Sequence, residues 1–232
     1  MWAKRYLFVL ALISIAFAPY AFAGLIPHLL YGKRIAGQVV DAETGKPIQN
    51  AYVIALWESP IFPSAFTGHN SREICYHAAV AKTGLDGQFE VAAWKKWSHY
   101  DVHNFEPIVN VYVPHYIPLF VSLQSSDGSE PVERVTEHYA LTPFIGTHEE
   151  RSNMLFRGLA NHDCRYGGES QKALFPMLQA IYGELSKIAK TNDERDTLDV
   201  IARIAAKAAL AIDPNGPAHD EEVQRFIREN LR

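Results

Sequence analysis

Residues 35–53 read IAGQVVDAETGKPIQNAYV and carry the clearest fold signal in the chain. The first six alternate with the two-residue period of a β-strand. A turn follows, in which Gly45 suits a positive φ angle and Pro47 presets φ. The Asp41 carboxylate is placed to accept hydrogen bonds from the turn amides. Together with Gly37 at the centre of the first strand, these residues have fold-specifying roles.

The same strand-and-turn pattern continues to about Phe144. A loop rich in Pro, Ser and Gly occupies residues 58–73, and Thr83-Gly-Leu-Asp-Gly87 is a tight turn before the core aromatic Phe89. Short strands at regular spacing with turn signals between them are typical of a β-sandwich. The seven expected strands are 35–41, 51–57, 75–82, 88–94, 108–113, 120–123 and 131–141.

Beyond Pro143 the apolar period becomes helical. Thr147-x-x-Glu150 and Thr191-x-x-Glu194 have capping-box spacing and predict helix starts. Apolar stripes predict long helices at about 174–190 and 193–213, followed by a charged stretch at 218–232. The two long helices are expected to form a hairpin, packed on itself or on an open sheet face. Glu149, Glu150 and Arg151 are interpreted as a solvated helix start.

The N-terminus has the pattern of a secretory signal peptide. Lys4 and Arg5 precede an apolar run at 6–18, and Ala21-Phe22-Ala23 offers small residues to a signal peptidase. The run is shorter than the roughly twenty residues that a membrane-spanning helix needs. We therefore expect cleavage after Ala23 and a periplasmic or secreted protein, with an uncleaved anchor as the alternative. The expected organisation is a 1–23 signal, a 24–32 linker, a 33–146 strand region and a 147–232 helical region.

The quoted stretch resembles the opening of a carboxypeptidase regulatory-like domain, whose pattern is G-x-V-x-D, then T-G-x-P, then A-x-V. Residues 83–89 resemble its second landmark, T-D-x-x-G-x-F, with Gly84 in place of Asp. The third landmark, Gly-Tyr, falls at His115-Tyr116, with His115 in place of Gly. The resemblance covers about half of the chain, and whole exported bacterial proteins look similar.

The resemblance implies an α+β fold, namely a seven-stranded prealbumin-like (transthyretin-like) β-sandwich followed by a C-terminal helical hairpin or tail. In metallocarboxypeptidases this module lies behind the catalytic domain and binds no zinc. The two H-x-x-E matches, at His103-Glu106 and His219-Glu222, lack the large catalytic scaffold that a peptidase needs. We expect no peptidase activity, no catalytic residues and no cofactor.

Two cysteines in an exported chain most simply pair with each other. A Cys75–Cys164 disulfide would close a loop of about ninety residues, worth about 4–5 kcal/mol in the chain-entropy model. It would clamp the helical region to the strand region. The alternatives are two buried free thiols or, less favoured, a catalytic thiol.

Several His, Tyr and Trp residues in the strand region are candidates for ligand binding. His99 and His103 are the best metal candidates, with Glu106 as a third ligand. Intradiol dioxygenases place iron on a similar sandwich with two Tyr and two His, and such a set can be arranged on paper from Tyr100, Tyr112, Tyr116, His103 and His115. Histidines that bond to loop backbone are the simpler interpretation. Aromatic residues, including Trp94 and Trp97, give a second possibility, a carbohydrate-binding surface. More often such residues cover the end of a sandwich.

Composition narrows the function class further. The net charge of −4 argues against general nucleic-acid binding, and no apolar run after the N-terminus is long enough to span a membrane. The expected function is a non-enzymatic exported envelope protein with a binding or structural module. Its partner is an unidentified envelope protein or glycan. The alternatives are a metal-dependent enzyme and a carbohydrate-binding module.

Overall fold

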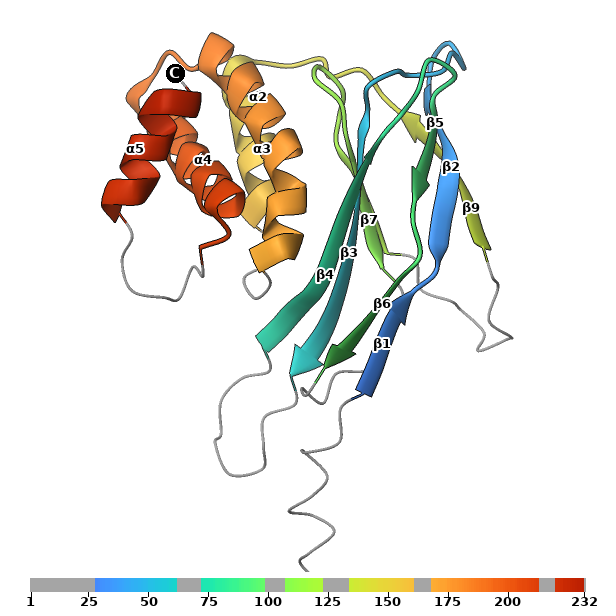
Figure 1. Cartoon of the computed structure of the whole chain (residues 1–232). Coiled ribbons are helices and arrows are strands. Elements are labelled where there is room, and N and C mark those ends of the chain that lie inside the picture. The colour runs from blue at the N-terminus through green and yellow to red at the C-terminus, as the bar shows by residue number, and fades with distance from the viewer. Residues whose placement is uncertain are drawn as a thin grey trace, which may run out of the picture.

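The computed structural model describes residues 28–61, 72–98, 107–122, 134–160, 168–212 and 220–231. Strands make up the N-terminal part of these residues and helices the C-terminal part (Figure 1). The predicted order of a strand region followed by a helical region is therefore confirmed, with the change of periodicity beyond Pro143 marking the boundary.

Two sheets form the strand region. One has the order β5-β2-β9, in which β2 pairs antiparallel with β5 and parallel with β9. The other is antiparallel throughout, with the order β4-β3-β7-β8. The bounds are β2 Arg34–Asp41, β3 Tyr52–Ile61, β4 Arg72–Lys82, β5 Gln88–Val91, β7 Ile108–Tyr112, β8 Leu119–Ser122 and β9 Arg134–Leu141.

One hydrophobic core is filled from both sheets. Alternate residues of each strand point into it, as the two-residue period of a strand requires. Phe89 and Tyr139 stack inside it with ring centroids 5.9 Å apart. The three-stranded sheet also contributes Ile35, Val39, Val91 and Leu141, and the four-stranded sheet contributes Val53, Ala55, Val109 and Val111.

A third, two-stranded sheet continues the first, and Leu30 on one of its faces belongs to the same core. β1 (His28–Gly32) leads into β2, and β6 (Trp94–Ser98) follows β5, so their antiparallel pairing extends that of β2 with β5 (Figure 1). We call β1 and β6 together the ribbon. The sequence placed 28–32 in a linker and 88–94 in one strand, and both expectations differ from the structure. Likewise β3 and β4 continue into the expected 58–73 loop.

The helices are α2 (His148–Ala160), α3 (Gly168–Ile188), α4 (Asn192–Leu210) and α5 (Asp220–Asn230). Both predicted capping boxes are present. The Thr147 hydroxyl accepts from the Glu150 amide at 3.2 Å, and Glu150 accepts from the Thr147 amide at 2.7 Å. Thr191 and Glu194 do the same at the start of α4. These reciprocal bonds satisfy amides that have no partner within the helix.

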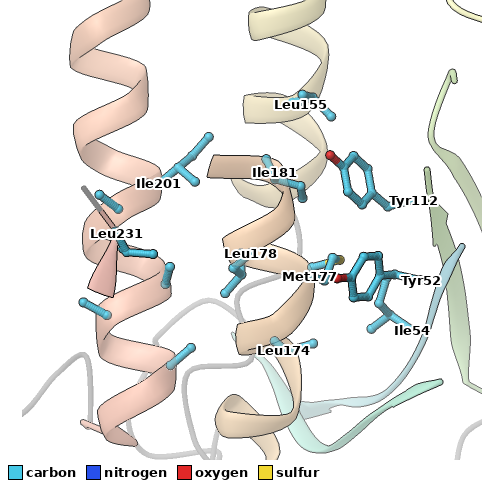
Figure 2. Packing of buried hydrophobic residues seen from close by; sticks show 14 of the residues in the cluster. Tyr52, Ile54, Tyr112, Leu155, Leu174, Met177, Leu178, Ile181, Ile201 and Leu231 are labelled. Atoms are coloured by element: carbon cyan, nitrogen blue, oxygen red, sulfur yellow. The ribbon is translucent and has the colours of Figure 1, made fainter. Parts of the chain in front are cut away.

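The helices cover the face of the four-stranded sheet that points away from the three-stranded sheet. The four-stranded sheet is therefore packed on both faces. Tyr52, Ile54 and Tyr112 point from the strands toward Met177 and Ile181 of α3 (Figure 2). α3 and α4 also pack against each other along their apolar stripes, as the predicted hairpin requires. The open-face packing that the sequence left as one option is the observed arrangement.

The residues of the quoted motif have the roles expected of them. Asp41 Oδ1 accepts from the amides of Glu43 and Thr44 at 3.0 and 2.7 Å. Gly45 has φ +67°, and Gly87 has φ +72°. A Cβ on Gly87 would lie 2.5 Å from the Val39 carbonyl oxygen and 2.9 Å from Pro47. Gly37 lies opposite Phe89 and Glu137 at the centre of its sheet.

Candidate functional site

The candidate ligand-binding residues fall into two groups. Trp94 and Trp97 belong to the ribbon, whereas Tyr112, His115 and Tyr116 lie at the end of β7 and in the turn after it. Tyr112 pairs with Tyr52 at the start of β3, and Trp94 packs on Trp57, five residues further along it. At about 3.3 Å per residue, the groups are roughly 16 Å apart. His99 and His103 lie outside the described residues.

A β-bulge shapes the first group. Trp57 pairs with His77 and Glu58 with Cys75, so Tyr76 is the extra residue on β4. A bulge interrupts the alternation of side chains and re-aims them. Here Tyr76 and His77 both contact the Trp94 ring, at centroid distances of 5.9 and 4.1 Å.

Trp94 lies at the centre of this aromatic group. It meets Trp57 edge-on at 5.3 Å. A Cβ at Gly32, its partner across the ribbon, would lie 2.1 Å from Trp94 Nε1, so glycine is required there. Among the described residues this buried indole N–H finds no hydrogen-bond acceptor. Through these contacts of Trp94, the aromatic group packs the ribbon against the bulge of β4.

His77 is held neutral by its surroundings. The pKa of His77 falls to about 4. The larger cause is burial between Trp57 and Trp94, and the smaller is the positive charge of Lys96. A neutral imidazole stacked on indole rings is an apolar packing group at neutral pH. His77 is thus a half-buried packing group between the two indoles.

The other side of the ribbon is apolar and open. Leu29 pairs with Trp97 and Tyr31 with Lys95, and alternation puts all four on one face. The exposed fractions are 42% for Leu29, 44% for Tyr31 and 65% for Trp97. We call these four residues the outer face. On the inner face, in contrast, Leu30 is only 2% exposed.

The second group joins the sheet to the helices. The Tyr112 hydroxyl donates to Glu184 Oε2 at 2.7 Å, and the His115 amide donates to Oε1 at 3.2 Å. Arg151 of α2 donates to both oxygens, from Nε at 2.9 Å and Nη2 at 3.0 Å. It also donates to the carbonyls of Val113 and Tyr116. The Glu184 carboxylate on α3 is thereby hydrogen-bonded to β7, to the turn after β7 and to α2.

Electrostatics fixes the charge state of this network. Burial opposes ionisation of Glu184, but the hydrogen bonds from Arg151 and Tyr112 and the charge of Arg151 outweigh it and lower the Glu184 pKa. Burial, followed by the nearby Glu184 charge, raises the pKa of Tyr112. The network therefore holds an ionised carboxylate, a guanidinium and a neutral phenol.

Tyr116 and His115 lie in the turn after β7. The Tyr116 hydroxyl donates to Asp41 Oδ2 at 2.9 Å, and this bond to a carboxylate raises the Tyr116 pKa. His115 has φ +67°, a left-handed conformation that costs a non-glycine residue about 1–2 kcal/mol. A glycine at this position would avoid that cost. The His115 side chain is 84% exposed, with Nδ1 3.9 Å from Glu184 Oε1.

Two residues of this network were missed from the sequence. Arg151 was interpreted as part of a solvated helix start, yet its side chain is only 3% exposed. It shares a buried helix face with Leu155. Glu184 gives a usable signal, because it follows Ile181 by three residues and Met177 by seven and so falls inside the apolar stripe of α3. A charged residue at such a position needs a buried partner.

Cys75 lies on the face of β4 that packs against the helices and is 1% exposed. Its Sγ lies 3.3 Å from the His77 carbonyl oxygen. Cys164 lies outside the described residues, so the disulfide stays a prediction. Within the described ranges, no group of three or more His, Cys, Asp or Glu side chains is arranged to hold a metal ion.

No known protein family matches the chain, and neither does any curated protein. Among solved structures, the chain is similar to a 3-chlorocatechol 1,2-dioxygenase from Rhodococcus opacus 1CP, with 13% identity and a TM-score of 0.30 over 50% of this chain and 60% of that one. It is also similar to a 9R-lipoxygenase from Cyanothece PCC8801, with 14% identity and a TM-score of 0.28 over 65% of this chain and 26% of that one. The chain thus spans less than two thirds of either protein.

Proposed function

We propose that the chain is a non-enzymatic exported protein of the bacterial envelope and that its strand region is a prealbumin-like, seven-stranded binding module. Its contact surface is the outer face of the ribbon. One observation carries this proposal: Leu29, Tyr31 and Trp97 lie side by side and exposed on one face of a ribbon whose other face is packed. Contiguous exposed apolar residues mark interaction sites more often than scattered ones do.

The prealbumin-like assignment draws support from the motif residues. Asp41 organises its turn, and Gly45 and Gly87 have positive φ angles. Tyr116 ties the third landmark back to Asp41. Two sheets that share one core are what such a module requires.

The contacts of the tyrosines favour a binding role over a metal enzyme. Tyr112 and Tyr116 donate to different carboxylates, those of Glu184 and Asp41, and both have raised pKa values. Both hydroxyls are therefore already engaged in hydrogen bonds within the protein. The metal-enzyme alternative thus depends on His99 and His103.

A photo-cross-linking amino acid at position 97 tests the contact surface in living cells. We expect cross-linked adducts from position 97 and none from position 85, where Leu85 is 81% exposed in the turn before β5, at the opposite end of β5 from the ribbon. Equal yields at the two positions, or none at 97, would contradict the proposed surface. Stoichiometric iron or zinc in protein purified from the envelope would contradict the non-enzymatic assignment.

A further inference from the structure

The outer face combines the side chains that favour the boundary between water and a lipid bilayer. Trp97 and Tyr31 are amphipathic aromatic residues, which concentrate at membrane–water interfaces, and Leu29 supplies a purely apolar side chain between them. Lys95 has an apolar stem with a cationic end that can reach upward to headgroup phosphates. All four belong to two adjacent strands, so they meet a flat surface together.

The ribbon also differs in charge from the rest of the chain. The sequences HLLYG and WKKWS contain two lysines and no carboxylate, whereas the whole chain has a net charge of −4. Lys95 and Lys96 are both exposed. Arg34, just beyond the ribbon, pairs with Glu90 instead. A local cationic surface on an anionic protein is complementary to anionic lipid headgroups.

The position of the ribbon in the chain points to the same occupant. The apolar run at 6–18 ends ten residues before His28, the first residue of β1. Ten extended residues span at most about 35 Å. If the run is kept as an anchor, β1 therefore starts within about 35 Å of the membrane.

We propose that the outer face binds the surface of a lipid bilayer with anionic headgroups. Leu29, Tyr31 and Trp97 enter the headgroup boundary, and Lys95 on the same face contacts the phosphates. Contact of this kind is peripheral, and none of the helices in the described part of the chain is long and apolar enough to cross a membrane. This inference rests on the proposed function, because it names the partner of the same surface.

Sedimentation with vesicles tests it, using protein recovered from the envelope of cells that express the full chain, with processing checked by mass. The vesicles are phosphatidylcholine mixed with phosphatidylglycerol, or phosphatidylcholine alone. We expect binding to the mixed vesicles and at least tenfold weaker binding for a Leu29→Ser, Trp97→Ser double variant. The matched control is Leu85→Ser, Ile145→Ser, which removes two exposed apolar side chains elsewhere and should bind like wild type. Lys95→Gln should weaken the preference for anionic vesicles.

Two results would overturn the lipid inference: wild-type protein that does not sediment with mixed vesicles, or a Leu29→Ser, Trp97→Ser variant that sediments as wild type does. Circular dichroism of each variant separates lost binding from lost folding. If vesicles fail while position 97 still cross-links to an envelope protein or glycan, the proposed surface stands and the lipid inference alone fails. If neither occurs, both fail.

Discussion

Arg151 and Glu184 form a two-point ion pair between α2 and α3, with Nε to Oε1 at 2.9 Å and Nη2 to Oε2 at 3.0 Å. Both side chains are at least 95% buried. Tyr112 and the His115 amide fill the remaining positions on the carboxylate. A buried charge pair is stabilising only with such extra hydrogen bonds, because they offset the loss of water. The pair thereby fixes how the helices lie on the four-stranded sheet.

Replacing Glu184 with Ala should destabilise the protein by about 3–5 kcal/mol, because the Arg151 charge stays buried without its partner. The measurement is the free energy of unfolding in urea. Glu229→Ala, at an exposed position near the end of α5, is the matched control and should change it by about 0.5 kcal/mol or less. Similar losses for the two variants would show that the ion pair does not hold the helices.

The close approach of Gly32 to Trp94 predicts that a larger residue at position 32 destabilises the protein. Gly32→Ala should destabilise the protein by about 1–3 kcal/mol, because its Cβ overlaps the indole. The near-ultraviolet circular dichroism of the aromatic group should change with it. Gly183→Ala, where a Cβ meets nothing within 4 Å in the middle of α3, should instead stabilise by about 0.5–1 kcal/mol. A silent Gly32→Ala variant would contradict the observed packing of Trp94.

His77 predicts a specific dependence of stability on pH. Its folded pKa, about 4, lies below the ordinary value of 6.5, so the unfolded chain binds this proton first. Stability should therefore decline as the pH falls from about 6.5 toward 4. His77→Phe should flatten this slope between pH 6.5 and 5, above the range where carboxylates titrate. A His77 NMR titration with a midpoint near 6.5 would contradict the half-buried, neutral imidazole.

The Cys75–Cys164 disulfide is decided by mass spectrometry of the unreduced exported protein. We expect no alkylatable thiol and a mass gain of about two hydrogens on reduction. Cys75→Ala should then destabilise the protein by about 2–5 kcal/mol and make the helical region more sensitive to protease than the strand region. Two alkylatable thiols without reduction would end the prediction.

Local sequence signals predicted the parts of the fold that depend on neighbours along the chain. The Asp41–Pro47 turn and both capping boxes are defined within a few residues, and all three have the expected hydrogen bonds. Long-range pairing was the harder part. His28–Gly32 is a strand because it pairs with Trp94–Ser98, a partner far away in sequence, and no local pattern in 24–32 shows that pairing.

The residue contacts in the two candidate groups could be predicted only in part, because they too depend on segments far apart in the sequence. The bulge that turns Tyr76 and His77 to one side depends on the register of β4 against β3. Arg151 follows two exposed glutamates, so its charge suggested solvent, although its helix face is buried by packing against another element. Tyr112 was singled out as a possible ligand, but its partner Glu184 lies on a helix that no local pattern connects to it.

Hydrogen–deuterium exchange of the exported protein, with and without isolated envelope membranes, measures most directly whether the outer face of the ribbon is the contact surface. Amides of the edge strand β1 report its burial, as do those of β6. We predict that membranes slow exchange in peptides covering 28–32 and 94–98 and leave the α4 and α5 peptides unchanged. Slowed exchange confined to the helices, or no change anywhere, would contradict the proposed function.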